Sequence, residues 1–250
     1  MTETHKNINT IYYEQYYAFP KRGEWMEKIW SEAFGEAYPT GLQHYGYLTK
    51  HDLKVLGERL ALPEGSSLLD IGCGKGGPGL HLAQELKLQL TGIDIVEDAV
   101  AQANQFKEKF ALSYPAQFMP GEFMNIPLED ESVDGVISID SLWVTHDKIE
   151  ALRAVKRVMK PGTKFVFTHW DLLSTDPVAL LETSGLKFVH REDTPDWKEY
   201  QRRVYAGIKK YETDLVAEMG ESANMLLYEA QASPPYLDLS VRRIYHFEKP

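Results

Sequence analysis

Short apolar segments alternate with helical segments between residues 67 and 169, and this alternation limits the possible folds more than any other feature. The predicted strands are residues 67–70, 88–94, 116–119, 135–140 and 164–169. The predicted helices between them are residues 79–86, 99–110 and 148–159. Strands separated by about ten to fifteen helical residues are typical of βαβ units. We therefore predict an α/β fold, in which the carboxyl ends of the strands lie at one edge of the sheet.

The segments on either side of this region predict a helical cap. Met26, Ile29 and Trp30 recur at helical spacing. Thr49 is followed three residues later by Asp52, which resembles a capping box at the start of a second helix. A long helical insert separates two late strands, one near residue 188 and one at 239–247. The predicted parts are an N-terminal helical cap at 1–65, a Rossmann-like core at 66–195, a helical lid insert at 196–235, and the final core strand at 236–250. The core is expected to hold a mostly parallel sheet of about seven strands with helices on both faces.

The insert has an apolar and aromatic stripe that predicts one helix. The stripe consists of Trp197, Tyr200, Val204, Ile208, Tyr211, Leu215 and Met219. The opposite face carries Lys198, Arg202, Arg203, Lys209 and Lys210. One interpretation is a solvated face over a packed stripe. The alternative is a lid whose stripe covers a substrate.

Composition and charge exclude several classes of protein. The 250 residues carry a formal net charge of −10, and an acidic surface repels the phosphate backbone of nucleic acids. Cys73 is the only cysteine, which excludes an intrachain disulfide and a cysteine-rich zinc site. Nothing near the N-terminus pairs a basic stretch with an apolar run, so no secretory signal is expected, and no apolar run reaches about 18 residues. We expect a cytoplasmic protein that binds neither nucleic acid, membrane nor metal, and that could form a homodimer.

A glycine-rich turn follows the first predicted strand, at residues 70–77 with the sequence Asp-Ile-Gly-Cys-Gly-Lys-Gly-Gly. Glycines there allow a sharp turn and the close approach of a ligand. Gly72, Gly74 and Gly77 also satisfy the dinucleotide-binding fingerprint. However, Asp70 precedes the first glycine, where its carboxylate would repel a pyrophosphate and would suit the α-ammonium group of an amino acid. Cys73 is interpreted as a small spacer between the glycines.

Carboxylates after the next strands add to this site. Asp94 ends the second strand, a position from which an acid can accept hydrogen bonds from both ribose hydroxyls. The alternative for Asp94 is a loop acid that caps the following helix. Glu122 follows the third strand and could accept a hydrogen bond from an adenine amino group, with Phe123 packed on the ring. Asp140 ends the fourth strand at the same edge.

The ordered set of motifs over residues 66–170 resembles the class I S-adenosylmethionine (SAM)-dependent methyltransferases. The motifs are Asp-x-Gly-x-Gly-x-Gly at 70–76, Gly-Ile-Asp at 92–94, Glu122 with Ile-Pro-Leu at 126–128, Val-Asp-x-Val-x-Ser at 133–138, and Val-Met-Lys-Pro-Gly at 158–162. The resemblance implies SAM as the cofactor. It implies that Asp70, Gly72 and Gly74 hold the methionine end, that Asp94 holds the ribose, and that Glu122 and Phe123 hold the adenine. We also place Ile95, beside Asp94, and Asp140 among the cofactor-binding residues.

The closest subgroup acts on small molecules such as natural products, sterols, quinones or amines, and covers the site with a cap. The resemblance therefore implies methyl transfer to an O, N or C atom of a small molecule. The alternative function is a SAM-binding enzyme of this fold that catalyses another reaction, such as a cyclisation. A third possibility, an NAD-dependent oxidoreductase, depends only on the glycine spacing, and Asp70 argues against it.

The chain departs from the subgroup at two places where catalytic groups are expected. Val144 stands at the usual histidine position after the fourth strand, and His146 follows two residues later. His169 ends the fifth strand, where relatives often have an aspartate. A histidine titrates near neutrality and can remove a proton from the acceptor. We predict His169 as the first candidate base and His146 as the second. The alternative for each is a hydrogen bond to a neighbouring loop.

Histidines and tyrosines of the N-terminal part complete the candidates. His44 and His51 are expected to be surface or cap residues. The tyrosines are Tyr12, Tyr13, Tyr16, Tyr17, Tyr45 and Tyr47. They would pack the N-terminal helices onto the core, or line a pocket for a sulfonium cation and an apolar acceptor.

Overall fold

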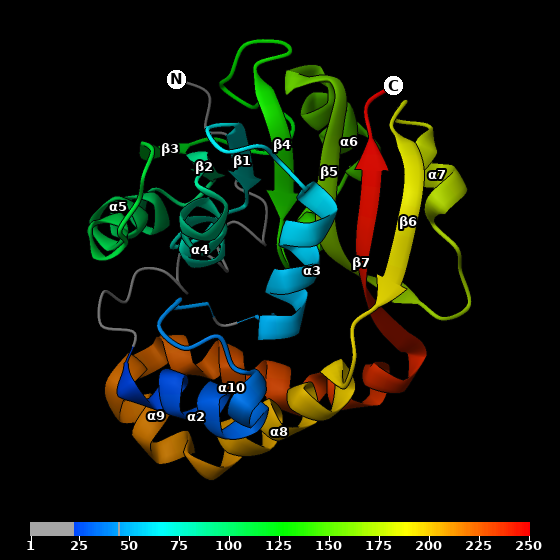
Figure 1. Ribbon diagram of the computed structural model, residues 1–250. Coiled ribbons are helices and arrows are strands. Elements are labelled where there is room, and N and C mark those ends of the chain that lie inside the picture. The colour runs from blue at the N-terminus through cyan, green and yellow to red at the C-terminus, as the bar shows by residue number, and fades with distance from the viewer. Residues whose placement is uncertain (1–22, 45) are drawn as a thin grey trace, which may run out of the picture.

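The structure is a computed structural model that describes residues 23–44 and 46–250. Its centre is a seven-stranded sheet in the order β3-β2-β1-β4-β5-β7-β6 (Figure 1). The strands are β1 (Ser67–Ile71), β2 (Gln89–Asp94), β3 (Ala116–Pro120), β4 (Val133–Ser138), β5 (Met159–Leu172), β6 (Lys187–Asp193) and β7 (Ser240–Glu248). Strand β7 is antiparallel to both β5 and β6, while β1 to β5 pair in parallel. The predicted α/β fold with a mostly parallel sheet is confirmed.

Helices cover both faces of the sheet, because successive strand residues point to opposite sides. The helices flanking the sheet are α3 (Lys50–Leu60), α4 (Gly77–Leu86), α5 (Glu97–Phe106), α6 (Lys148–Val158) and α7 (Val178–Glu182). Leu68 of β1 shares one buried cluster with Leu56 of α3 and Leu82 of α4. Its neighbour Leu69 lies in another cluster, with Leu152 of α6. The predicted capping box is present, since the Thr49 side chain and the Asp52 side chain each accept the other's backbone N–H.

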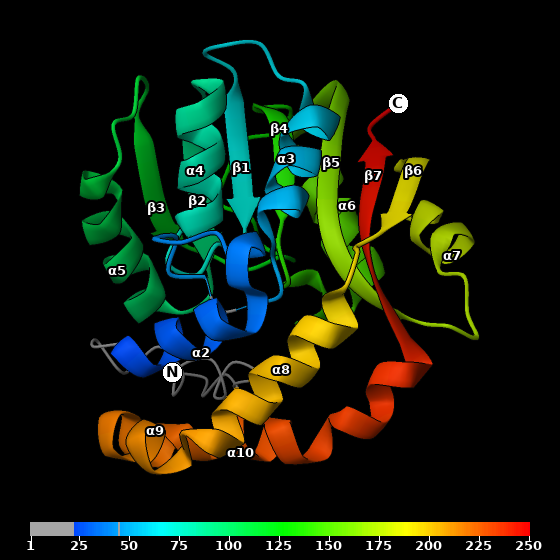
Figure 2. The ribbon, with the colours of Figure 1, turned by 60° about the horizontal axis from the view of Figure 1, so that its bottom comes forward.

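A separate group of helices lies across the carboxyl edge of the sheet (Figures 1 and 2). These are α2 (Glu24–Phe34), α8 (Trp197–Lys210), α9 (Glu212–Met219) and α10 (Ala223–Ala232). Their apolar faces form one buried cluster that includes Met26, Trp30 and Val204, and Trp170 of β5 packs against it from the sheet. Residues from the N-terminal cap and the lid insert therefore share one core.

The prediction of one continuous helix from Trp197 to Met219 is wrong. The helix breaks at Tyr211, whose φ of −106° and ψ of 24° separate α8 from α9. The Tyr211 ring lies 5.0 Å from that of Trp25, and its hydroxyl lies 3.0 Å from a carboxylate oxygen of Glu32. These contacts with α2 stabilise the bend. The basic face of α8 is solvated as the first interpretation expected, and the stripe is packed in the cap.

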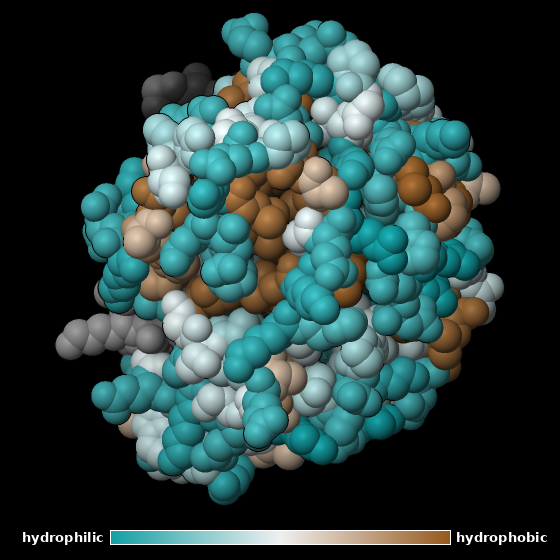
Figure 3. Space-filling model, viewed as in Figure 1, coloured by the Kyte–Doolittle hydropathy of each residue, from teal (hydrophilic) through white to brown (hydrophobic). Residues whose placement is uncertain are grey.

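Shorter features complete the described part of the chain. Single-turn 3₁₀ helices occupy Gly35–Ala37, Lys107–Lys109, Leu142–Val144 and Gly220–Ser222, and a two-turn 3₁₀ helix occupies Pro234–Leu239. A groove between α3 and α4 is lined by Leu53, Leu82 and Leu86 among others, and Figure 3 shows apolar surface in a hollow on this face. Among the described helices, none is long and apolar enough to cross a membrane.

Candidate cofactor and acceptor site

The glycine turn lies where the strand order reverses, between β1 and β4, which is where open α/β sheets bind ligands. Gly72, Gly74 and Gly76 have φ values of 73°, 55° and 76°, a region that favours glycine. A Cβ at Gly72 would lie 2.4 Å from the Ser141 hydroxyl oxygen, and one at Gly76 would lie 2.5 Å from the Phe118 ring. The turn therefore needs glycine for conformation and for space.

Asp94 ties this turn to the end of β2. One carboxylate oxygen accepts the Gly74 N–H at 2.7 Å, and the other accepts the Val96 N–H at 3.0 Å. Burial raises the pKa of Asp94, and these backbone hydrogen bonds oppose the rise. Asp94 thus holds the loop before α5 through the amide of Val96, but the first turn of α5 has no side-chain cap, so the capping alternative is not confirmed. Each oxygen can accept a further hydrogen bond, so ribose hydroxyls remain compatible with this arrangement.

Asp70 is buried beneath the start of α4. A Cβ at Gly79 would lie 2.5 Å from an Asp70 carboxylate oxygen, and the Gly79 backbone donates a hydrogen bond to it. Burial, together with the charge of Asp94, raises the pKa of Asp70 to about 7. The Asp70 carboxylate faces α4. It would therefore act on the ammonium group of a cofactor only through the residues of the glycine turn. Its role toward the methionine end stays a prediction.

The adenosine side of the predicted site is open. The side chains of Glu122 and Ile95 are exposed, and the Phe123 ring lies 3.5 Å from where a Cβ on Gly72 would stand. The Phe123 ring thus lies beside the glycine turn, and the exposed Glu122 carboxylate precedes it in the chain. These groups fit the adenosine part of SAM, and the contacts themselves stay a prediction.

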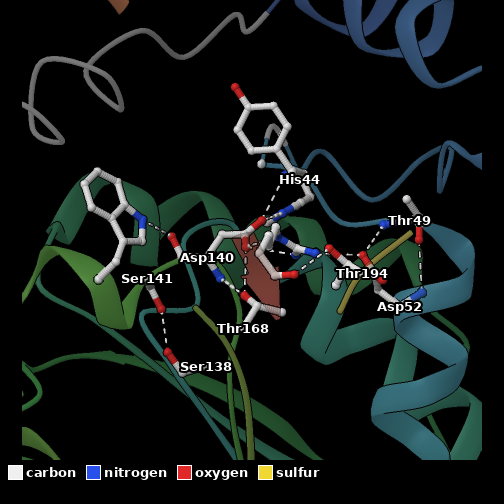
Figure 4. Close-up of polar contacts among 12 residues, drawn as sticks. His44, Thr49, Asp52, Ser138, Asp140, Ser141, Thr168 and Thr194 are labelled. Atoms are coloured by element: carbon white, nitrogen blue, oxygen red, sulfur yellow. Dashed lines mark hydrogen bonds and ion pairs between the residues drawn. The ribbon is translucent and has the colours of Figure 1, made fainter. Parts of the chain in front are cut away.

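Asp140 has partners that the sequence prediction did not include (Figure 4). Its oxygen Oδ1 accepts hydrogen bonds from the Thr168 hydroxyl at 2.7 Å and from Arg242 Nε at 3.0 Å. Oδ2 accepts the Tyr47 N–H at 2.8 Å and lies 3.5 Å from Nε2 of His44. Burial alone would raise the pKa of Asp140, but Arg242 and His44 hold it well below its usual range. These contacts bind the cap to the end of β4, and a cofactor contact for Asp140 stays a prediction.

Arg242 links Asp140 to the start of α3. Its Nη1 donates to Oδ2 of Asp52 at 3.0 Å, and its Nη2 lies 2.9 Å from Oδ1 of Asp140. The guanidinium is completely buried, and burial would lower its pKa, but the two carboxylates raise it. One arginine on the last strand therefore joins the capping box of α3 to the site edge.

An aromatic wall faces the cap beside this network. The ring of Trp170 lies 5.8 Å from that of Tyr47 and 6.3 Å from that of Trp143, both nearly perpendicular. The Tyr47 hydroxyl reaches Glu229 of α10 at 3.5 Å, and Tyr205 donates to the same oxygen at 2.9 Å. Sequence reasoning included Tyr47 but missed Trp170. Strand alternation after Thr168 was the available signal, because it places residue 170 on the face of residue 168.

The two candidate bases, His169 and His146, are not part of this aromatic wall. His169 points to the opposite face of β5 from Trp170, and its Nδ1 lies 3.0 Å from Oδ1 of Asp171. Asp171 also accepts the Tyr245 hydroxyl and an Arg243 hydrogen bond. Burial would raise the pKa of Asp171, but these neighbours, His169 first, lower it. His146 is exposed in the loop before α6. The catalytic roles of both histidines stay predictions.

The other predicted N-terminal residues have different outcomes. Tyr12, Tyr13, Tyr16, Tyr17 and Tyr45 lie outside the described residues. Tyr47 packs in the cap cluster. His51 is exposed at the start of α3, as expected. His44 lies in the cap as expected, but its contact with Asp140 brings it to the site. In the ranges 23–44 and 46–250, no group of three or more His, Cys, Asp or Glu residues could hold a metal ion.

Comparison with known proteins agrees with this geometry. Residues 69–167 match the family described as "Methyltransferase domain". Methyltransferase phqN of Penicillium fellutanum is 32% identical over 47% of this chain and 36% of its own length. Sterol 24-C-methyltransferase ERG6B of Gibberella zeae is 30% identical over 58% of this chain and 36% of its own length. The match thus covers about a third of these two curated relatives.

Solved structures share the fold over nearly the whole chain. A putative sarcosine dimethylglycine methyltransferase from Galdieria sulphuraria has a TM-score of 0.75 at 16% identity, covering 95% of this chain and 98% of that one. The [4+2]-cyclase SpnF has a TM-score of 0.74 at 20% identity, covering 90% and 93%. Residues 69–167 therefore match a methyltransferase domain, and the chain has the fold of these solved structures, as the sequence motifs predicted.

Proposed function

We propose that this protein binds SAM and transfers its methyl group to an O, N or C atom of a small molecule. The observation that carries the proposal is the glycine turn at the β1/β4 switch point, held by Asp94 and flanked by the Phe123 ring. The methyltransferase relatives support the same activity. The acidic net charge of −10 argues against a nucleic acid acceptor. We also propose that the protein works in the cytoplasm.

Each residue of the proposed site would have a separate role. Asp94 would accept hydrogen bonds from the ribose, Glu122 would accept one from the adenine amino group, and Phe123 would pack on the base. SAM, when bound, supplies an electrophilic methyl group on a sulfonium. The cap helices and the aromatic wall would exclude water and hold the acceptor in line. Such positioning can offset about 7–11 kcal/mol of a barrier.

Removal of a proton from the acceptor has two candidates. His169 has the arrangement of a base with an orienting carboxylate, because Asp171 holds its Nδ1 and its Nε2 has no partner among the described residues. His146 lies on the loop that follows β4. Both enter this proposal as candidate bases, and an acceptor without a removable proton would need neither.

Calorimetric titration with SAM and with S-adenosylhomocysteine (SAH) tests the cofactor part. We expect both to bind, and Asp94→Asn to weaken binding at least about tenfold, equivalent to about 1.4 kcal/mol. The matched control is Asp134→Asn, because Asp134 lies at the other end of the sheet in an ion pair with Lys160. The absence of any heat with either compound would refute the proposal.

The reaction product distinguishes methyl transfer from the alternative function. SAH release in proportion to acceptor consumed indicates methyl transfer. Conversion of a substrate without SAH release indicates a reaction such as the cyclisation that the name of SpnF describes for that protein.

A further inference from the structure

Four polar side chains meet inside the otherwise apolar cap, and we call them the cap polar cluster. They are Glu229 of α10, Tyr205 and Gln201 of α8, and Tyr47, which lies shortly before α3. Tyr205, Gln201 and Tyr47 are each more than nine-tenths buried. Buried polar groups are stable only when hydrogen bonds offset the loss of water. The hydrogen bonds of each group therefore show which partner the cluster still lacks.

Hydrogen bonds run through the cap polar cluster in one direction. The Gln201 amide nitrogen donates to the Tyr205 hydroxyl at 2.6 Å, and this hydroxyl donates to Oε1 of Glu229 at 2.9 Å. The Tyr47 hydroxyl donates to the same oxygen at 3.5 Å. Burial, followed by the charge of Glu229, raises the pKa of Tyr205 to about 12 and also raises the pKa of Tyr47. Both phenols therefore keep their protons at neutral pH.

The other end of the Gln201 amide is a buried acceptor. Its Oε1 has no hydrogen-bond partner among residues 23–44 and 46–250. Exchanging the nitrogen and oxygen of the amide would not help, because the Tyr205 proton goes to Glu229 and two oxygens would then face each other. A buried acceptor without a donor costs free energy. The Gln201 oxygen therefore marks a place for a molecule that carries N–H or O–H groups.

Direct contacts join the cap polar cluster to the edge of the sheet that carries the glycine turn. The Tyr47 ring lies 5.8 Å from the ring of Trp170 near the end of β5, and the Tyr47 N–H donates to Asp140 after β4. The next residue, Ser141, donates its hydroxyl to the carbonyl oxygen of Ile71, where the turn begins. Figure 2 shows α8 and α10 on this side of the sheet. A molecule in the cluster would thus lie on the cofactor side of the sheet.

The groups at this place favour a positively charged occupant. A carboxylate such as Glu229 forms its strongest hydrogen bonds with charged donors, and aromatic rings such as those of Tyr47 and Trp170 attract cations. A neutral hydroxyl could donate to the Gln201 oxygen but would gain little from the charge of Glu229. An ammonium group offers several N–H donors and a positive charge together.

We propose that the cap polar cluster is an acceptor subsite in which Glu229 and Gln201 bind the ammonium group of a primary or secondary amine. Glu229 forms an ion pair with the ammonium group, and Oε1 of Gln201 accepts one of its N–H groups. The rings of Tyr47 and Trp170 lie beside the apolar part of the molecule. The role as an acceptor subsite rests on the proposed function, and it narrows the acceptor to molecules that carry a basic nitrogen.

The test compares phenethylamine, which is an ammonium ion at neutral pH, with 2-phenylethanol, in which a neutral hydroxyl replaces the amine. Each compound is titrated calorimetrically into the full chain in the presence of SAH. We expect phenethylamine to bind at least about tenfold more tightly than 2-phenylethanol. Glu229→Gln should remove most of this preference. Equal affinity of the wild type for the two compounds would overturn the inference, even if no variant folds.

A quaternary amine separates the role of Gln201 from that of Glu229. Phenethyltrimethylammonium keeps the positive charge but has no N–H group. Gln201→Leu should weaken phenethylamine at least about threefold and leave phenethyltrimethylammonium within about twofold of its wild-type affinity. Glu229→Gln should weaken both. An equal loss of both compounds in Gln201→Leu would show that Gln201 only supports the fold of the cap, and would overturn its assignment to the subsite.

The controls separate this inference from the proposed function. Glu221→Gln makes the same change of charge at an exposed position of the cap, and it should leave the affinity for phenethylamine within about twofold of the wild type. If the wild-type protein binds no SAH, the proposed function fails. If it binds SAH but binds phenethylamine no better than 2-phenylethanol, only the acceptor subsite fails.

Discussion

The guanidinium of Arg242 and the carboxylate of Asp140 form a largely buried ion pair, although Arg242 lies on β7, Asp140 follows the end of β4, and the two residues are 102 positions apart in the chain. Asp52 is the second partner of Arg242. A buried charge is stable only when its partners offset the cost of removing it from water. The three side chains are therefore one unit, and they connect α3, β4 and β7.

Replacement of this arginine tests that unit. We expect Arg242→Met to lower the free energy of unfolding by about 3–5 kcal/mol, because Asp52 and Asp140 would be left buried without a counter-charge. Urea denaturation followed by circular dichroism measures the change. Arg202→Met is the control, since Arg202 pairs with Asp238 at the surface, and it should change stability by less than about 1 kcal/mol. Equal effects of the two substitutions would contradict the interpretation.

A second prediction concerns Gly72 in the turn. Gly72→Ala would place a Cβ 2.4 Å from the Ser141 hydroxyl and force alanine to a φ of 73°. We expect a loss of stability of at least about 1–3 kcal/mol and weaker SAH binding in calorimetry. Adding Ser141→Gly to the Gly72→Ala variant removes the clash but not the backbone strain. The double variant should therefore regain only part of the lost stability and only part of the SAH affinity. Full rescue would show that strain at this φ is unimportant.

The side of β5 that faces the cap gives a third prediction. Trp170 contacts Tyr47 and Trp143, and Arg242 lies 5.4 Å from its ring centroid. Trp170→Ala removes these contacts, and we expect a loss of about 3 kcal/mol, at the lower end for a tryptophan because the ring is only partly buried. Leu172→Ala is the control two residues along on the same face, where the side chain is 55% exposed. It should change the free energy of unfolding by no more than about 0.5 kcal/mol.

The fold and the glycine turn were predictable because their signals are local. Strand and helix periodicity, the capping box of Thr49 and Asp52, and the run from Asp70 to Gly77 can all be read within a few residues. The ion pairs of Arg242 were not, because pairing across the sheet depends on strand order. The break at Tyr211 depends on its contacts with Trp25 and Glu32 in a distant helix. Periodicity alone continues through that position.

The length of β5 has a similar cause. The apolar run predicted a strand at 164–169, whereas β5 extends from Met159 to Leu172. Its additional carboxyl-terminal residues pair with β7, so that Trp170 lies opposite Arg242 and Leu172 opposite Ser240. A polar or exposed residue continues a strand when its backbone finds such a partner. This extension continues the strand alternation to Trp170, and the pairing with β7 that sustains it could not be read from residues 164–172 by themselves.

The last prediction concerns Asp70 and pH. Its pKa is about 7 in the folded protein against 3.8 without burial. Between these values the folded state keeps the proton and the unfolded state loses it. The contribution of Asp70 to stability is therefore fully present below pH 4 and is lost as the pH rises to about 7, at up to about 1.4 kcal/mol per pH unit. Above that pH it should not change further.

Urea denaturation at pH 5, 6, 7 and 8 measures this dependence as the difference between wild type and Asp70→Asn, whose amide cannot ionise. We expect the wild type to lose stability relative to the variant from pH 5 to 7 and the difference to be constant above. Asp134→Asn is the control. Burial would raise the pKa of Asp134, but the hydrogen bonds from Lys160 and Ser67 outweigh burial, so the pKa is lowered. Its stabilising effect is lost only as the pH falls below 4, so its difference from wild type should be constant across this range. A constant difference for Asp70→Asn as well would show that the carboxyl group under α4 is already ionised at pH 5.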